Sequence, residues 1–162
     1  MEIPVFVSRP TTLNPQQEQS YKLITQQLKR FRLVDRTLGR SDYPTVFPLR
    51  EVVVLASHCA GGLVLGFQQF LSLRGINKPG TGTEPIDSEK PFPTPWNHLE
   101  AGIMFGLGLP LLIFREEGIN GGVFDTGVSD VFIHSMPAEH SDSLDEVFLK
   151  WQADVRQRYY NP

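Results

Sequence analysis

One carboxylate stands in the most apolar stretch of this chain, beside residues that can bind a ring and a sugar. The segment TPWNHLEAGIMFGLGLPLLIF, residues 94–114, carries a single charged side chain, Glu100. If the segment begins as a helix, Trp96 and Asn97 lie four and three residues before Glu100 and share its face. The positive end of the helix dipole then favours an ionised carboxylate.

Such a carboxylate suits glycosyl chemistry. Cleaving a glycosidic bond creates positive charge on the anomeric carbon, which a nearby carboxylate can attack or stabilise. Trp96 can stack on a base or a pyridine ring. The same spacing also fits an ordinary first-turn acid beside a core tryptophan, and the local pattern leaves both interpretations open.

A capped helix must position these side chains. Thr94 can cap a helix that begins at Pro95 and runs to about Gly106. A separate apolar stripe, about 100° away on the helix, consists of Leu99, Ile103 and Leu107. We expect this stripe to face the sheet, which would leave Glu100 at the boundary between the core and a cleft.

The rest of the chain alternates between apolar runs and amphipathic segments. Expected strands are 3–8, 32–38, 62–67 and 109–116, and expected helices are 15–31, 48–60 and a last one capped by Ser141 or Ser143. Residues 52–56 also fit a strand because three valines follow one another. We prefer the helix there, since Pro48 suits its first turn and Gly61 its end.

Strands that alternate with helices predict one α/β domain over residues 1–162, with a mostly parallel sheet and helices on both faces. Ligands of such sheets bind at the carboxyl ends of the strands, here Ser8-Arg9, Phe67-Gln68 and Arg115-Glu116. Residues 68–93 are rich in Gly and Pro and predict a long loop insertion. Loops of this length are usually either functional or disordered, so this segment is a candidate lid.

The order of these motifs resembles two known families. PWNHLEAG, residues 95–102, ahead of GLPLLIF resembles the Trp-x-x-x-Glu segment of Toll/interleukin-1 receptor (TIR) domains. It is also similar to the Glu-containing helix start of nucleoside 2-deoxyribosyltransferases. IPVFVSRP, residues 3–10, resembles the first strand of both families, and residues 48–67 resemble their helix and strand that end near the substrate.

This resemblance covers roughly residues 3–116. It implies a flavodoxin-like (TIR-like) fold and a catalytic glutamate, Glu100, that acts on the anomeric carbon of an N-glycoside such as NAD or a nucleoside. Ser8, Arg9 and Asn97 would place the sugar or phosphate, with Trp96 on the leaving base. The aspartate that transferases carry before the catalytic segment is missing unless Asp87 serves, which favours cleavage or binding over base exchange.

Two functions are therefore expected. The first is N-glycosidic bond cleavage or transfer on NAD or a related nucleotide or nucleoside. The alternative is a non-catalytic nucleotide-sensing or protein-assembly module of the same fold. A homo-oligomer stays open in both cases.

Other residues carry weaker predictions. Asp125 and Asp130 can bind ribose hydroxyls or act as turn formers through their own backbone hydrogen bonds. KPGTGTE, residues 78–84, lacks the flanking strand and helix of a phosphate loop. The four histidines lack metal-ligand spacing, so we expect no metal and no cofactor, with NAD only as a substrate.

Composition narrows the classes of partner and the location. With 40% apolar and 20% charged residues the chain should fold, and a net charge of −3 disfavours nucleic acid. No apolar run reaches the ~20 residues of a membrane-spanning helix, so we expect no membrane partner. The single Cys59 and the absence of a secretory leader predict a cytoplasmic protein.

Overall fold

Five parallel strands form the central sheet in the order β2-β1-β3-β6-β7. The computed structural model describes residues 2–38 and 48–161. The strands are β1 (Ile3–Ser8), β2 (Leu33–Arg36), β3 (Gly61–Gly66), β6 (Leu111–Arg115) and β7 (Ile133–Ser135). Taken in chain order, this is the flavodoxin-like arrangement, in which the connections reverse direction between β1 and β3. The predicted fold class is confirmed.

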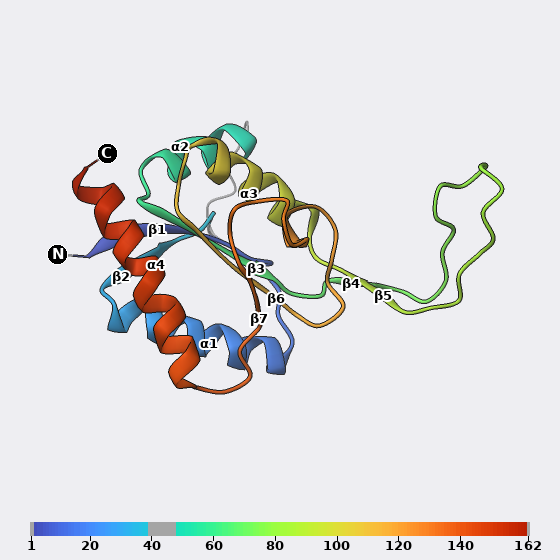
Figure 1. Cartoon of the computed structure of the whole chain (residues 1–162), viewed down its shortest axis with the longest axis horizontal. Helices are drawn as coiled ribbons and strands as arrows, with labels where there is room; N and C mark the ends of the chain where they lie inside the picture. The colour runs from blue at the N-terminus through green and yellow to red at the C-terminus, as the bar shows by residue number, and fades with distance from the viewer. Residues whose placement is uncertain (1, 39–47, 162) are drawn as a thin grey trace.

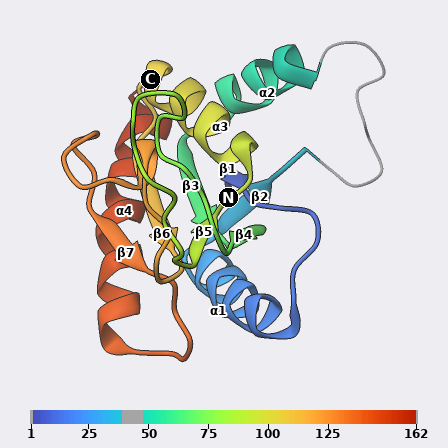
Figure 2. The same ribbon diagram turned by 90° about the vertical axis from the view of Figure 1, so that its right-hand side faces the viewer.

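Helices cover both faces of the sheet (Figures 1 and 2). They are α1 (Pro15–Arg30), α2 (Pro48–Ser57), α3 (Pro95–Gly106) and α4 (Asp142–Tyr160). Buried side chains of α1 and α4 pack with Val5 and Val7 in one core, whereas those of α2 and α3 pack with Phe6 in the other. Successive residues of β1 therefore serve opposite cores.

Local capping explains why three helices begin where the sequence predicts. The Asn14 side chain accepts a hydrogen bond from the Gln17 backbone, and the Gln17 side chain accepts one from the Asn14 backbone, which completes a capping box for α1. Thr94 caps α3 and Ser141 caps α4. Such caps each contribute about 1 kcal/mol.

The segment that also fitted a strand, residues 52–56, is helical and belongs to α2. Val52 and Ala56 are buried, whereas Val53 and Val54 are exposed. The helix ends at Ser57, earlier than predicted. The apolar run after it becomes β3, which is fully buried between β1 and β6.

The rotation of α3 about its axis differs from the prediction. Its buried residues are Asn97, Glu100, Ala101 and Met104, while Leu99 of the expected sheet-facing stripe is 44% exposed. The reason lies in the sheet, because a Cβ on Gly62 would come within 2.4 Å of the Met104 sulfur. Met104 therefore fills the space that glycine leaves, and the face that carries Glu100 is turned toward the core.

Residues 68–93 form the predicted insertion, which is irregular over most of residues 73–89 but is closed by paired strands at its base. Two short strands, β4 (Phe70–Ser72) and β5 (Lys90–Phe92), pair antiparallel, and Gly75 bridges Ile86 farther out. We call residues 70–92 the arm. Figure 1 shows it projecting from the body instead of folding over the sheet, so in this structure it does not form the expected lid.

Candidate functional site

The candidate site begins where β1 ends, at the point where the sheet connections reverse direction. Ser8 is the last residue of β1 and is fully buried. By alternation along the strand it points to the same side as Phe6, toward α2 and α3. This is the sheet edge at which open α/β folds bind ligands.

Ser8 is tied to α3 through Asn97. The Asn97 Nδ2 donates to the Ser8 hydroxyl at 2.9 Å and to the Ser8 carbonyl oxygen at 3.3 Å. The Ser8 hydroxyl also interacts with the Glu100 carboxyl group. We call these three residues the Ser8–Asn97–Glu100 cluster. It unites three of the six site residues that the sequence predicts.

The Glu100 carboxyl group is unusually placed for an acid. Only 8% of the residue is exposed, which corrects the expectation that Glu100 lies at the edge of a cleft. Burial raises the pKa of Glu100 to about 7, and the hydrogen bond from Ser8 opposes that rise. Over residues 2–38 and 48–161, no Lys, Arg or His forms an ion pair with it.

One polar atom of the cluster has no partner. Asn97 is fully buried, and its Oδ1 accepts no hydrogen bond. The amide cannot be turned around to solve this, because the Ser8 carbonyl only accepts and so requires the Nδ2 beside it. A buried acceptor without a donor costs about 1–3 kcal/mol, which a ligand hydroxyl or N–H would recover.

Trp96 lies on the outer side of the first turn of α3. It is 43% exposed, unlike Asn97 and Glu100, so the three residues do not share one environment. Its backbone N–H is held by the Thr94 cap. The indole ring is available to a flat ligand that approaches the start of α3.

Arg9 turns away from the cluster. Its guanidinium lies 4.4 Å from the centre of the Tyr21 ring on α1, and its Nη1 donates to the Pro10 carbonyl. The Arg9 Nε is buried without an acceptor. The structure thus places the Arg9 side chain beside α1, and no described hydrogen bond or ion pair joins it to Asn97 or Glu100.

Asp125 is engaged in a turn. Its Oδ1 accepts from the Gly121 backbone at 2.7 Å, around the short helix η1 (Gly122–Phe124), as the turn-former interpretation expects. Burial lowers the pKa of His98, and the negative charge of Asp125 opposes that effect. His98 also contacts the edge of Phe124, so this loop packs on α3 one face away from Glu100.

Sequence reasoning missed a polar cavity of about 1010 Å³ at the carboxyl ends of β3, β6 and β7. At its rim, the Glu116 carboxylate accepts from the Gln17 side chain at 2.9 Å and from the Gln68 backbone. Gln17 also donates to the Gln68 carbonyl. The sequence marked Gln68 and Glu116 as strand ends, but only folding brings Gln17 to them.

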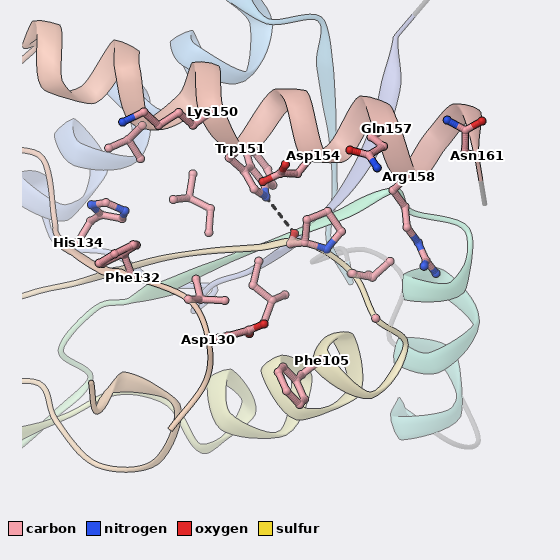
Figure 3. A pocket seen from close by; sticks show the side chains of 17 residues that line it. Phe105, Asp130, Phe132, His134, Lys150, Trp151, Asp154, Gln157, Arg158 and Asn161 are labelled. Atoms are coloured by element: carbon pink, nitrogen blue, oxygen red, sulfur yellow. Dashed lines mark hydrogen bonds between the residues drawn. The ribbon is translucent and has the colours of Figure 1, made fainter. Parts of the chain in front are cut away.

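A second cavity, of about 830 Å³, lies beside the amino end of β6 (Figure 3). The Trp151 indole N–H donates to the Pro110 carbonyl across it. Phe105 and Phe132 line it from the side of α3 and the loop before β7. Glu100 lines neither of these cavities, and the burial of Ser8, Asn97 and Glu100 makes the cluster a nearly closed site.

No group of three metal-ligating side chains occurs among the described residues. In the same part of the chain, no helix has the length and apolarity needed to span a bilayer. The chain matches no protein-family model, and no curated protein matches it.

Proposed function

We propose that this protein cleaves or transfers the N-glycosidic bond of a nucleotide or nucleoside, with NAD as the first substrate to test and Glu100 as the catalytic carboxylate. The observation that carries the proposal is the Ser8–Asn97–Glu100 cluster. It is a buried carboxylate, hydroxyl and amide at the sheet edge where ligands bind, with one acceptor left free.

The chemistry follows from the charge that develops on the sugar. The bond between the anomeric carbon and the base nitrogen breaks, and its electron pair leaves with the base. Glu100 then forms the new bond to carbon, or stabilises the cation until water or another acceptor attacks. A positive ring such as nicotinamide favours the ionised carboxylate, which offsets the effect of burial on its pKa.

The neighbouring residues take matching roles. The free Oδ1 of Asn97 accepts a hydrogen bond from a sugar hydroxyl, and the Ser8 hydroxyl holds the carboxylate in place. The exposed Trp96 ring stacks on the base. We assign no main role to Asp125 or Arg9. The Asp125 carboxylate accepts a hydrogen bond within a turn, and the Arg9 guanidinium lies over the Tyr21 ring.

The depth of Glu100 sets a condition on this proposal. A sugar reaches a carboxylate that is 8% exposed only after the first turn of α3 and the loop after Ser8 separate. Figure 2 shows that this helix start lies next to the base of the arm. We therefore place the substrate entrance between Trp96 and the end of β1.

The test compares three proteins incubated with NAD and with a panel of nucleosides. Free base is measured by chromatography for the wild type, Glu100→Gln and Glu146→Gln. Glu146 is a matched control because it is an exposed glutamate on a different helix, α4. We expect the wild type and Glu146→Gln to release base and Glu100→Gln to release none. Equal release by Glu100→Gln would refute the assignment.

A second function, ligand binding without chemistry, is favoured by the burial of Glu100 and by its absence from both cavities. A nucleotide-sensing or assembly module needs the free Asn97 acceptor but no reactive carboxylate. Thermal shifts with nucleotides separate the two functions. A raised melting temperature with no released base supports the sensor, whereas released base supports the enzyme.

The remaining parts of the proposal concern partner and place. A nucleotide or nucleoside is the proposed small-molecule partner. Cys59 is buried, and burial raises the pKa of its thiol to about 11, so it is a poor nucleophile. A single inert thiol fits the reducing cytoplasm that we propose as its location.

A further inference from the structure

The arm is the most unusual surface of the molecule, because both of its branches expose large apolar side chains along the half nearer the body. Their exposed fractions run from 37% to 64%, and they are Phe70, Leu71, Leu73, Ile76, Ile86 and Phe92. A monomeric protein seldom displays so many together on one projecting element. We therefore expect a binding partner to bury these side chains in the functional state.

The arm is also incomplete as a sheet. In the described part of the chain, its sheet consists of β4 and β5 alone. A two-stranded ribbon is at best marginally stable in water, and three or more strands are needed to hold one together. Figure 1 shows the arm pointing away from its own body, so the body does not supply a third strand in this structure.

The charges of the arm indicate what kind of partner fits. Its three basic and three acidic residues are Arg74, Lys78 and Lys90, and Glu84, Asp87 and Glu89. Arg74 and Asp87 are already paired within the arm at 3.1 Å. A neutral surface gives no attraction to nucleic acid or an acidic membrane, and it does not repel a copy of itself.

We propose that the arm is a self-association element, which pairs with the arm of a second copy of this chain to form a four-stranded sheet. A two-fold contact joins the same strand edge of both copies, so one event pairs the open backbone edges of both arms and brings their apolar side chains next to each other. The arm supplies 23 residues, residues 70–92, and a stable interface uses about 20–30 residues on each side. This inference is independent of the reaction proposed for Glu100.

The base of the arm is built to hold it outward. The Gln69 backbone donates to the Phe92 carbonyl at 2.9 Å, which closes the two strands where they leave the body. Pro91 packs so closely on the loop after β6 that a Cβ on Gly118 would lie 2.9 Å from its Cγ. Pro91 also lacks an N–H, which makes β5 a poor edge for a new strand and leaves β4 as the pairing edge.

The first experiment measures the molar mass of the full chain by sedimentation and by light scattering. We expect the mass of two 18.3 kDa chains for the wild type. Leu73→Asp should lower it twofold, to one chain, while Leu149→Asp should stay at two. The two leucines are matched because they are 64% and 56% exposed, one on the arm and one on α4. A monomeric wild type, or equal masses for the two variants, would overturn the proposal.

The second experiment asks whether the arm meets another arm or the body of the second copy. Residues 73–89 are replaced by Asn-Gly, which closes a two-residue hairpin between Ser72 and Lys90. This short-arm chain should be monomeric and melt cooperatively. Mixed with tagged wild type, it should form no mixed dimer. Mixed dimers would show that the arm docks on a body, and would overturn pairing between arms.

Discussion

The Ser8–Asn97–Glu100 cluster and the arm depart in opposite ways from the usual rule that polar side chains are exposed and apolar side chains are buried. The cluster buries a carboxylate, an amide and a hydroxyl, and the arm exposes phenylalanine, leucine and isoleucine. Exposed single apolar residues and buried hydrogen-bonded groups are common, whereas an unpartnered buried acceptor and a long apolar projection are not. Each exception costs stability, so each points to an interaction that the isolated chain does not make.

The comparison also separates two kinds of partner. The cluster is buried, and its free atom is a hydrogen-bond acceptor, which suits a polar group of a small molecule. The arm offers area and backbone edges, which suit another polypeptide. One fold therefore carries a candidate site for a small molecule and a candidate surface for a protein, a short distance apart along the chain.

The largest effect we expect follows from removing the charge of the cluster. Glu100→Gln keeps the shape of the side chain but removes the carboxylate, so base release should fall by roughly 10²–10⁴-fold or more. Wild-type release should rise with pH through about 7, because the ionised form of Glu100 is the active one. Chromatography of the released base across pH checks both statements, and release that falls through this range would contradict the second.

The next effect is on stability against pH. Glu100 has a folded pKa of about 7 and a reference value of 4.5, so the folded state keeps its proton longer than the unfolded state. The Glu100 contribution therefore becomes less favourable as pH rises from about 4.5 to 7, by on the order of 3 kcal/mol. Denaturation of wild type and Glu100→Gln should show the variant gaining relative stability over this range. Parallel curves of unfolding free energy against pH for the two proteins would contradict a raised pKa of Glu100.

A smaller effect is expected from Asn97→Ala, which leaves the Ser8 carbonyl and hydroxyl without their donor. The free energy of unfolding should fall by about 1–3 kcal/mol. Asn77→Ala, on the exposed arm, is the control and should change it by about 0.5 kcal/mol or less. Urea denaturation measures the free energy of unfolding of both variants. Similar losses for Asn97→Ala and Asn77→Ala would contradict the proposed contrast between the buried cluster and the exposed arm.

The smallest effect concerns the arm in dilute solution, where association is absent. Leu73→Ala should change the free energy of unfolding by about 0.5 kcal/mol or less, because the side chain is 64% exposed. Leu63→Ala removes a fully buried leucine of β3 and serves as the contrast, with an expected loss of about 2–5 kcal/mol. A comparable loss at Leu73 would show that the arm packs on its own body.

Most of the fold could be predicted from the sequence because its signals are local. Caps such as Asn14 and Thr94 lie within a few residues of the backbone groups that they satisfy. The apolar runs of β1 and β3 are continuous because both faces of the sheet are covered. The mostly parallel sheet follows from the alternation of strands and helices.

The errors share a different origin, since they depend on residues far apart in the sequence. Gly62 decides which face of α3 is buried, and nothing within residues 95–106 announces that contact. The pairing of Phe70 with Phe92 spans a segment whose Gly and Pro content is typical of a loop. The sequence predicted that Ser8, Asn97 and Glu100 belong to one site. Only the three-dimensional structure shows that Glu100 is buried and that the Asn97 Oδ1 has no hydrogen-bond donor.

Because its base is fixed to the body, the arm is a structurally separate element. Gln69 and Phe92 close its two strands, Pro91 is seated against Gly118, and the buried Pro93 anchors the chain before α3 begins. Movement of the tip is therefore insulated from the first turn that carries Asn97. We therefore expect that an arm of another length or sequence can be grafted between Ser72 and Lys90 without disturbing the interior, which would let the proposed assembly and the proposed ligand binding vary separately.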